Sequence, residues 1–187
     1  MNSLKAYFET EAQLFARLTL DRADEVIARL ARARLEGRRV FLFGNGGSAA
    51  TASHFACDLG KGTVVPNLPR FKVIALNDNL PTLTAYANDV GYDSVFAEPL
   101  LSLAERGDIA IAFSGSGSSP NVLRAMEAAG KLDVVTIGFT GFAGGKLKDR
   151  VELHVNVPSE SMGQIEDVHL ALTHAMCEML KIRHEQA

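Results

Sequence analysis

A glycine-rich loop is the first feature of this chain that could bind an anion. Residues 40–43 are apolar, residues 44–48 read Gly-Asn-Gly-Gly-Ser, and an alanine-rich segment follows. A strand, a glycine turn and a helix start direct free N–H groups and the helix dipole at one point, which predicts a phosphate site. The loop also fits a dinucleotide fingerprint, with Asn77-Asp78 after the next strand, and a glycine turn without a ligand is the plain alternative. No Lys-Ser/Thr follows the glycines, which excludes a P-loop.

Two titratable residues lie further along the same predicted helix. His54 and Asp58 are four residues apart, so they share one helix face. An imidazole beside a carboxylate could transfer protons or bind a metal ion. A surface ion pair without such a function remains the alternative.

A second loop, residues 114–121, is rich in serine and glycine. Hydroxyls and backbone N–H groups suit a phosphate. Flexible linkers have a similar composition, but this stretch lies inside a strand–loop–helix unit and is too short to separate domains. We therefore favour phosphate binding here as well.

The last predicted helix carries further candidates. Glu166 and Asp167 open it, where acids also favour the helix dipole. His169 lies about 140° round the helix from His174, so we expect His169 to be structural. His154 and His184 receive no role.

The composition narrows the class of protein. The 187 residues are 47% hydrophobic and 22% charged, the formal net charge is −3, and no basic run stands out. These values favour one globular domain over residues 1–187 and argue against nucleic-acid binding. With two cysteines, no secretory leader and no apolar run near the roughly 20 residues of a membrane span, we expect a soluble cytoplasmic protein without membrane contact.

Strand and helix patterns alternate along the chain. Mostly continuous apolar runs predict buried parallel strands at 40–43, 71–76, 109–113, 134–138 and 153–157. Helices are expected as a pair over 3–36, with Asp21 as an N-cap and Gly37 at the end, and at 48–59, 81–87, 95–105, 121–129 and 164–183. The order predicts an α/β fold with ligands beyond the carboxyl ends of the strands, where both loops lie.

As a set, several stretches resemble the sugar isomerase (SIS) domain family, and within it the phosphoheptose isomerases. They are GNGGSAATASHF, the Asn88-Asp89 pair, SGSGSSPNVLRAMEAA, TGFAGGKL and QIEDVHLALTHAM. The resemblance implies a flavodoxin-like three-layer sandwich with a five-stranded, mainly parallel sheet. It also implies a homotetramer with sites between subunits, in which the N-terminal helices of residues 1–36 serve oligomerisation, and zinc in the site.

The resemblance also implies roles for individual residues. The substrate would be bound by Asn45, Gly46, Gly47, Ser48, Asn88, Asp89, Ser114, Gly115, Ser116 and Ser119. His54 and His174 match family metal ligands, and His174 also matches the acid/base histidine.

Two positions depart from the family pattern. The family has Glu, the expected base and metal ligand, where this chain has Asp58, and Gln where it has Glu166. A misplacement of about 1 Å can cost roughly a hundredfold in rate. We interpret the result as a rebuilt site in which His54, Asp58, Glu166 and His174 bind zinc or another divalent ion. Asp58, as the slightly preferred base, Glu166 and His174 are the catalytic candidates.

The expected reaction is an aldose–ketose isomerisation through a cis-enediol. The substrate that the resemblance implies is sedoheptulose 7-phosphate, and the product is D-glycero-D-manno-heptose 7-phosphate, although a six- or eight-carbon ketose phosphate also fits. The alternative is a non-catalytic SIS protein that binds a sugar phosphate or a partner, such as a replication initiator.

Overall fold

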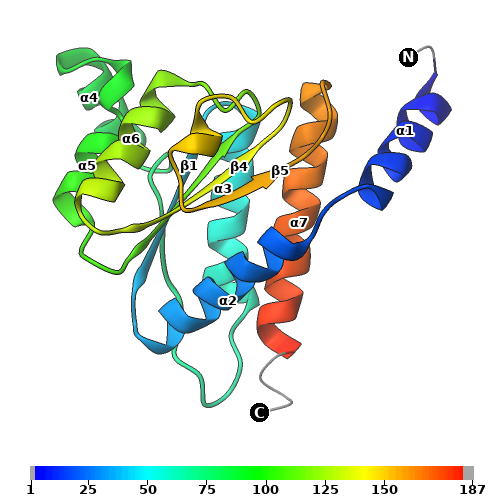
Figure 1. The fold of residues 1–187 in the computed structure, drawn as a ribbon. Coiled ribbons are helices and arrows are strands. Elements are labelled where there is room, and N and C mark those ends of the chain that lie inside the picture. Colours follow the sequence, from blue (N-terminus) through cyan, green and yellow to red (C-terminus); the bar gives the residue numbers. More distant parts are fainter. Residues whose placement is uncertain (1–2, 183–187) are drawn as a thin grey trace.

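The computed structural model describes residues 3–182 and shows one five-stranded sheet (Figure 1). Its strands are β1 (Arg39–Gly44), β2 (Lys72–Ala75), β3 (Ile109–Ser114), β4 (Val135–Thr140) and β5 (Leu153–Asn156). The strand order is β2-β1-β3-β4-β5, and every neighbouring pair is parallel. This is the flavodoxin-like order, and it confirms the predicted α/β class.

Helices connect the strands and precede the sheet. They are α1 (Leu4–Ala16), α2 (Asp21–Leu35), α3 (Gly47–Cys57), α4 (Leu80–Asp89), α5 (Ala97–Leu103), α6 (Pro120–Lys131) and α7 (Met162–Ile182). Single turns add η1 (Asp58–Gly62, π-helical), η2 (Tyr92–Ser94) and η3 (Leu147–Asp149).

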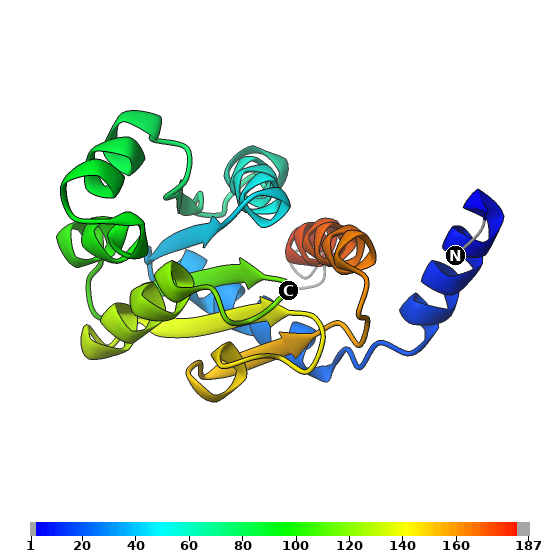
Figure 2. The same cartoon turned by 90° about the horizontal axis from the view of Figure 1, so that it is seen from above.

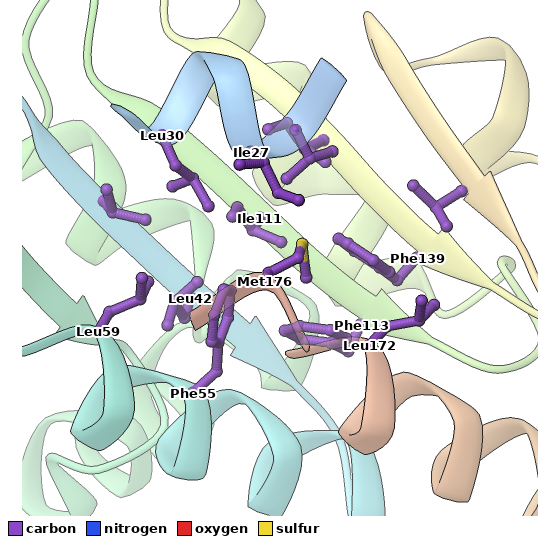
Figure 3. Packing of buried hydrophobic residues seen from close by; sticks show 14 of the residues in the cluster. Ile27, Leu30, Leu42, Phe55, Leu59, Ile111, Phe113, Phe139, Leu172 and Met176 are labelled. Carbon is purple, nitrogen blue, oxygen red and sulfur yellow. The ribbon is translucent and has the colours of Figure 1, made fainter. Parts of the chain in front are cut away.

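The sheet divides the core into two layers because successive strand residues point to opposite faces. On β1, Val40 and Leu42 pack with α2, α3 and α7, whereas Phe41 and Phe43 pack with α5 and α6. Figure 3 shows the first layer, where Phe55 of α3 lies among side chains of α2, the strands and α7. Helices α3 and α7 are thereby held side by side on one face of the sheet.

Helix α1 stands apart from this sandwich in both views (Figures 1 and 2). Its one buried residue is Leu14, near the point where it turns towards α2. Leu4 and Phe8 are 79% and 62% exposed. The Tyr7 hydroxyl donates to Asp167 Oδ2 of α7 at 2.7 Å, and this bond with burial raises the pKa of Tyr7 to about 12.

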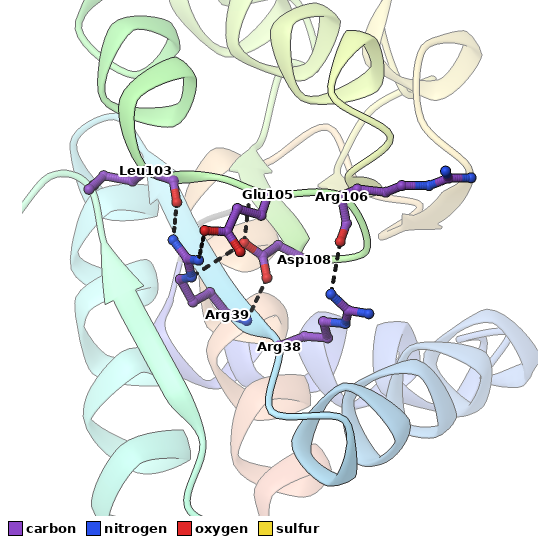
Figure 4. A network of polar contacts seen from close by, with 6 residues as sticks. All are labelled: Arg38, Arg39, Leu103, Glu105, Arg106 and Asp108. Atoms are coloured by element: carbon purple, nitrogen blue, oxygen red, sulfur yellow. Dashed lines mark hydrogen bonds and ion pairs between the residues drawn. The ribbon is translucent and has the colours of Figure 1, made fainter.

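A polar network ties the sheet together at the edge opposite the glycine-rich loops (Figure 4). The Asp108 carboxylate is buried and accepts from the backbone N–H of Arg39 at 2.8 Å and of Glu105 at 2.9 Å. The Arg39 guanidinium lies 2.6 Å from a Glu105 carboxylate oxygen. The starts of β1 and β3 are therefore joined through one carboxylate.

Local details differ from the expected elements in two places. Asp21 is wrong as an N-cap: it is the first residue of α2, and Leu20 before it makes no side-chain cap bond. The helix expected over 48–59 changes to a π-helical turn at Asp58. The Asn88-Asp89 pair forms the end of α4. Arg183 and His184 lie outside the described residues. None of the helices in residues 3–182 combines the length and apolar character needed to cross a bilayer.

Candidate functional site

A cavity of about 240 Å³ lies at the carboxyl ends of β1 and β3. The first loop, the second loop and the start of α7 form its walls. The lining residues are Asn45, Gly46, Gly47, Ser48, Phe113, Ser114, Gly115, Ser116, Ser119, Met162 and Glu166. The two loops thus lie together, as we predicted from the fact that each follows a parallel strand.

The first loop turns sharply at glycines that other residues would not replace. Gly46 has φ 55° and ψ −124°, a conformation that glycine adopts without strain. A Cβ on Gly44 would lie 2.7 Å from the Phe113 backbone oxygen. Helix α3 begins at Gly47 without a side-chain cap and without an acid in its first turn. Its N-terminus is therefore suited to an electronegative ligand group.

The second loop is braced from behind by the turn at residues 141–147. Gly141 N–H donates to Gly115 at 2.8 Å, and Leu147 N–H donates to Gly117 at 2.8 Å. Gly117 has φ 61°, and a Cβ there would lie 2.1 Å from the Gly144 oxygen. Ser119, at the N-cap of α6, makes no side-chain cap bond. Its hydroxyl and the start of α6 can serve an oxyanion.

Glu166 is the acidic residue that lines this cavity. A Cβ built on Gly47 would lie 2.2 Å from Glu166 Oε2 and 2.4 Å from both Oε1 and Cδ. The carboxylate therefore rests directly against the backbone at the start of α3. The absence of a side chain at Gly47 leaves the space that it occupies.

His54, Asp58 and His174 form a separate group further along α3 and α7. The two Nε2 atoms of the histidines are 2.9 Å apart, and Asp58 Oδ2 lies 3.3 Å from His54 Nε2 and 3.8 Å from His174 Nε2. Asp58 opens the π-helical turn η1, an irregularity that often occurs at functional sites. Both histidine side chains are 49% exposed, so ligands can reach the group.

The donor atoms of this group fit a divalent ion. One ligand atom from each of the three residues lies within 4.8 Å of the other two. Two imidazole nitrogens and a carboxylate oxygen are a set that zinc binds in sites with an open position. Glu166 is not in this group, since eight residues of α7 separate it from His174, about 12 Å along the axis. The predicted four-residue set is therefore corrected to three within one subunit.

The structure also adds two residues that sequence reasoning missed. Asn121, at the start of α6, exchanges side-chain hydrogen bonds with Asn45, and the Tyr92 hydroxyl donates to Asn45 Oδ1. Asn121 follows a Ser-Pro at a helix start, which was a signal for a polar capping role. No local signal indicated Tyr92.

Other candidates lie away from the cavity. Asn88 and Asp89 are exposed on α4 and bond to each other at 2.7 Å, so the described chain does not bring them to the loops. His169 is buried, and its Nε2 lies 3.1 Å from the Thr140 oxygen, which agrees with a structural role. Burial lowers the pKa of His169 to about 4.

Comparisons with known proteins show the family and the fold. Residues 6–141 match the family model of the SIS domain. The phosphoheptose isomerase of Thermodesulfovibrio yellowstonii is 39% identical over 95% of this chain and 89% of its own length. The Mycobacterium tuberculosis phosphoheptose isomerase is 42% identical over 87% and 82%. A Francisella tularensis phosphoheptose isomerase structure aligns with a TM-score of 0.88 and 28% identity, covering 95% of this chain and 96% of that one.

Proposed function

Because the chain belongs to the SIS domain family and groups there with phosphoheptose isomerases, we propose that it isomerises sedoheptulose 7-phosphate to D-glycero-D-manno-heptose 7-phosphate. One observation carries this proposal. A cavity lined by serine hydroxyls and the starts of two strand–loop–helix units opens beside Glu166, and the helices α3 and α7 that reach it also bring His54, Asp58 and His174 together. Phosphate binding and proton transfer are therefore available on one face of the molecule.

The phosphate is assigned to the second loop and the start of α6. Ser114, Ser116 and Ser119 supply hydroxyls there, and none of the cavity-lining side chains is cationic. The acidic Glu166 lies against the first loop and would repel a phosphate placed beside it. Asn45, Gly46, Gly47 and Ser48 therefore contact the sugar rather than the phosphate. Binding of the phosphate, which is remote from the reacting carbons, positions these carbons for proton transfer.

The chemistry is a proton transfer between neighbouring carbons. A carboxylate removes a proton from C1 of the ketose, the cis-enediol forms, and the carboxyl group, whose proton exchanges with solvent before the second transfer, delivers a proton to C2. His174 moves a proton between the two oxygens or, in the alternative, holds a metal ion that polarises the carbonyl. Asp58 is the preferred base because it lies with His174, while Glu166 lies nearer the loops that hold the phosphate end. Glu166 then contacts sugar hydroxyls, and it is the alternative base.

Zinc is part of the proposal. His54, Asp58 and His174 would hold it, and a bound divalent ion would polarise the substrate carbonyl. Measuring metal content by mass spectrometry, on protein purified without a chelator, tests this separately from activity.

We also propose a homotetramer of a single SIS domain over residues 1–187, with residues 1–36 serving its assembly and active sites between subunits. Exposed Leu4, Phe8 and Phe15 on the projecting α1 support this surface, as does the open histidine group. Asn88 and Asp89 would then serve a site completed by another subunit. A cytoplasmic location belongs to the same proposal, because the described Cys57 and Cys177 are both free thiols.

The deciding experiment is deuterium uptake into sedoheptulose 7-phosphate in heavy water. We expect deuterium at the reacting carbons, and uptake is measured both with and without added zinc. Asp58→Asn is expected to abolish uptake, Glu166→Gln to reduce it, and Glu160→Gln, at an exposed acid in the loop before α7, to leave it unchanged. Absence of uptake by the unmodified protein under both conditions would refute the reaction and favour a non-catalytic sugar-phosphate-binding protein.

A further inference from the structure

We propose that Asn121 and Tyr92 are positioning residues that fix the side-chain amide of Asn45, so that its nitrogen is the group offered to a substrate oxygen. The inference rests on the proposed function for its substrate. It adds two residues outside the cavity lining to the machinery of the site.

The two asparagines form a closed amide pair between the two loops. Asn45 Nδ2 donates to Asn121 Oδ1 at 3.0 Å, and Asn121 Nδ2 donates to Asn45 Oδ1 at 2.9 Å. Asn121 is 2% exposed, whereas Asn45 lines the cavity. The pair therefore joins the loop after β1 to the start of α6 through one buried and one accessible amide.

A backbone group determines which way round both amides lie. Val122 N–H lies 3.0 Å from Asn121 Oδ1, and a backbone N–H can only donate. The Asn121 atom at that position is therefore the oxygen, and the Asn45 atom facing it is the nitrogen. It follows that Asn45 Oδ1 faces Asn121 Nδ2 and also accepts from the Tyr92 hydroxyl at 3.0 Å.

This arrangement leaves Asn45 with one group to offer. Its oxygen already accepts two hydrogen bonds, from Asn121 and Tyr92, which use both lone pairs. Its nitrogen has a second hydrogen, and no residue within 3–182 accepts it. Because Asn45 lines the cavity, that hydrogen can bind a carbonyl or hydroxyl oxygen of the sugar. A freely turning amide would present its oxygen as readily as its nitrogen.

Two small substitutions disturb the amide without touching the cavity lining. Tyr92→Phe removes one donor to Asn45 Oδ1, and we expect kcat/KM to fall about tenfold. Asn121→Asp keeps an acceptor for Val122 but places a second oxygen against Asn45 Oδ1, and we expect a fall of about 10- to 100-fold. Tyr86→Phe is the matched control: this tyrosine lies on α4, and no residue in the described chain is bonded to its hydroxyl. It should retain full activity.

A double-mutant cycle separates positioning from general structural or charge effects. In an Asn45→Ala background, Tyr92→Phe and Asn121→Asp should each lower kcat/KM by less than twofold further. They should also raise the Kd for sedoheptulose 7-phosphate by less than twofold. Equal losses with and without Asn45 would overturn the proposal. Melting temperatures identify any variant that does not fold, and the Tyr92→Phe arm keeps the test decisive if Asn121→Asp fails.

A measurement without substrate keeps this inference distinct from the proposed reaction. Nitrogen-15 NMR spectra report the Asn45 side-chain amide directly, and its signal is assigned as the one lost in Asn45→Ala. This signal should shift in Tyr92→Phe and keep its position in Tyr86→Phe. An unmoved signal in Tyr92→Phe would refute the network. If the unmodified protein binds the sugar without turnover, the proposed reaction fails, and the cycle in Kd still decides the role of Asn121 and Tyr92.

Discussion

Replacing Gly47 by Ala should separate activity from stability in this protein. The added Cβ would lie 2.2–2.4 Å from all three carboxyl atoms of Glu166, so rotation of the carboxylate about its own axis brings no relief. Ordinary contact begins near 3.4 Å, so Glu166 must retreat by about 1.2 Å (3.4 minus 2.2). A shift of about 1 Å at a reacting or positioning group costs roughly a hundredfold in rate, and this is the expected fall in kcat/KM.

The fold itself should tolerate this change. The clash is with the far end of a flexible side chain, which can turn towards the cavity. Gly47 is the first residue of α3 and does not have a positive φ, so alanine suits its backbone. Reduced freedom of the unfolded chain contributes about 0.4–1 kcal/mol in favour of the variant. We therefore expect a melting temperature equal to or slightly above that of the unmodified protein.

Steady-state kinetics with sedoheptulose 7-phosphate and thermal unfolding of the same samples test this expectation. Gly130→Ala is the matched control, because a Cβ there meets nothing within 4 Å and the site is within α6. It should keep full activity. In a Glu166→Ala background, Gly47→Ala should have no further effect on kcat/KM. Full activity of Gly47→Ala would refute the position and role that we assign to Glu166, as would a loss of the same size in the Glu166→Ala background.

Three further changes test other parts of the structure. Asp108→Ala removes the acceptor of two backbone N–H groups and should lower the free energy of unfolding by about 2–4 kcal/mol in urea titrations, whereas a loss below about 1 kcal/mol would contradict the network of Figure 4. In the folded protein His169 is neutral at pH 5 and above, because its pKa is about 4. In the unfolded chain the imidazole takes up a proton below about pH 6.5, so the free energy of unfolding should fall by about 2 kcal/mol from pH 7 to pH 5. His169→Gln should remove that part of the pH dependence, and an unchanged slope would argue against it. His54→Ala should lower the zinc content of the purified protein at least tenfold and leave the melting temperature nearly unchanged. A zinc content equal to that of the unmodified protein would exclude His54 as a ligand.

The parts of the fold that could be predicted are those that short stretches of sequence determine. The five strands were found because most of them are largely apolar runs, and the loops after β1 and β3 had to meet because parallel strands end at one edge. His54 and Asp58 were paired by helical spacing alone. Each of these predictions needed only residues that are close in sequence.

The parts that could not be predicted depend on how distant helices pack. The family resemblance, and no local pattern, grouped His174 with His54. The registration of α7 against α3 that places Glu166 at Gly47 has no local signal in the sequence. The bond from Tyr92 to Asn45 likewise spans 47 residues. The π-helical turn over Asp58–Gly62 continues past residue 59, where the pattern predicted the helix to end, and no local signal indicated it.

On the proposed assignment of the site, the shared direction of α3 and α7 relates the length of the substrate to the spacing of the site residues. Both helices lead from the cavity towards the histidine group, and Glu166 and His174 are eight positions, or about 12 Å of axis, apart. If the phosphate is anchored at the serine loop, as proposed, a ketose phosphate extends along these helices to bring its first carbons towards Asp58. A shorter sugar phosphate would then bind at the same loop with its carbonyl further from the proposed base.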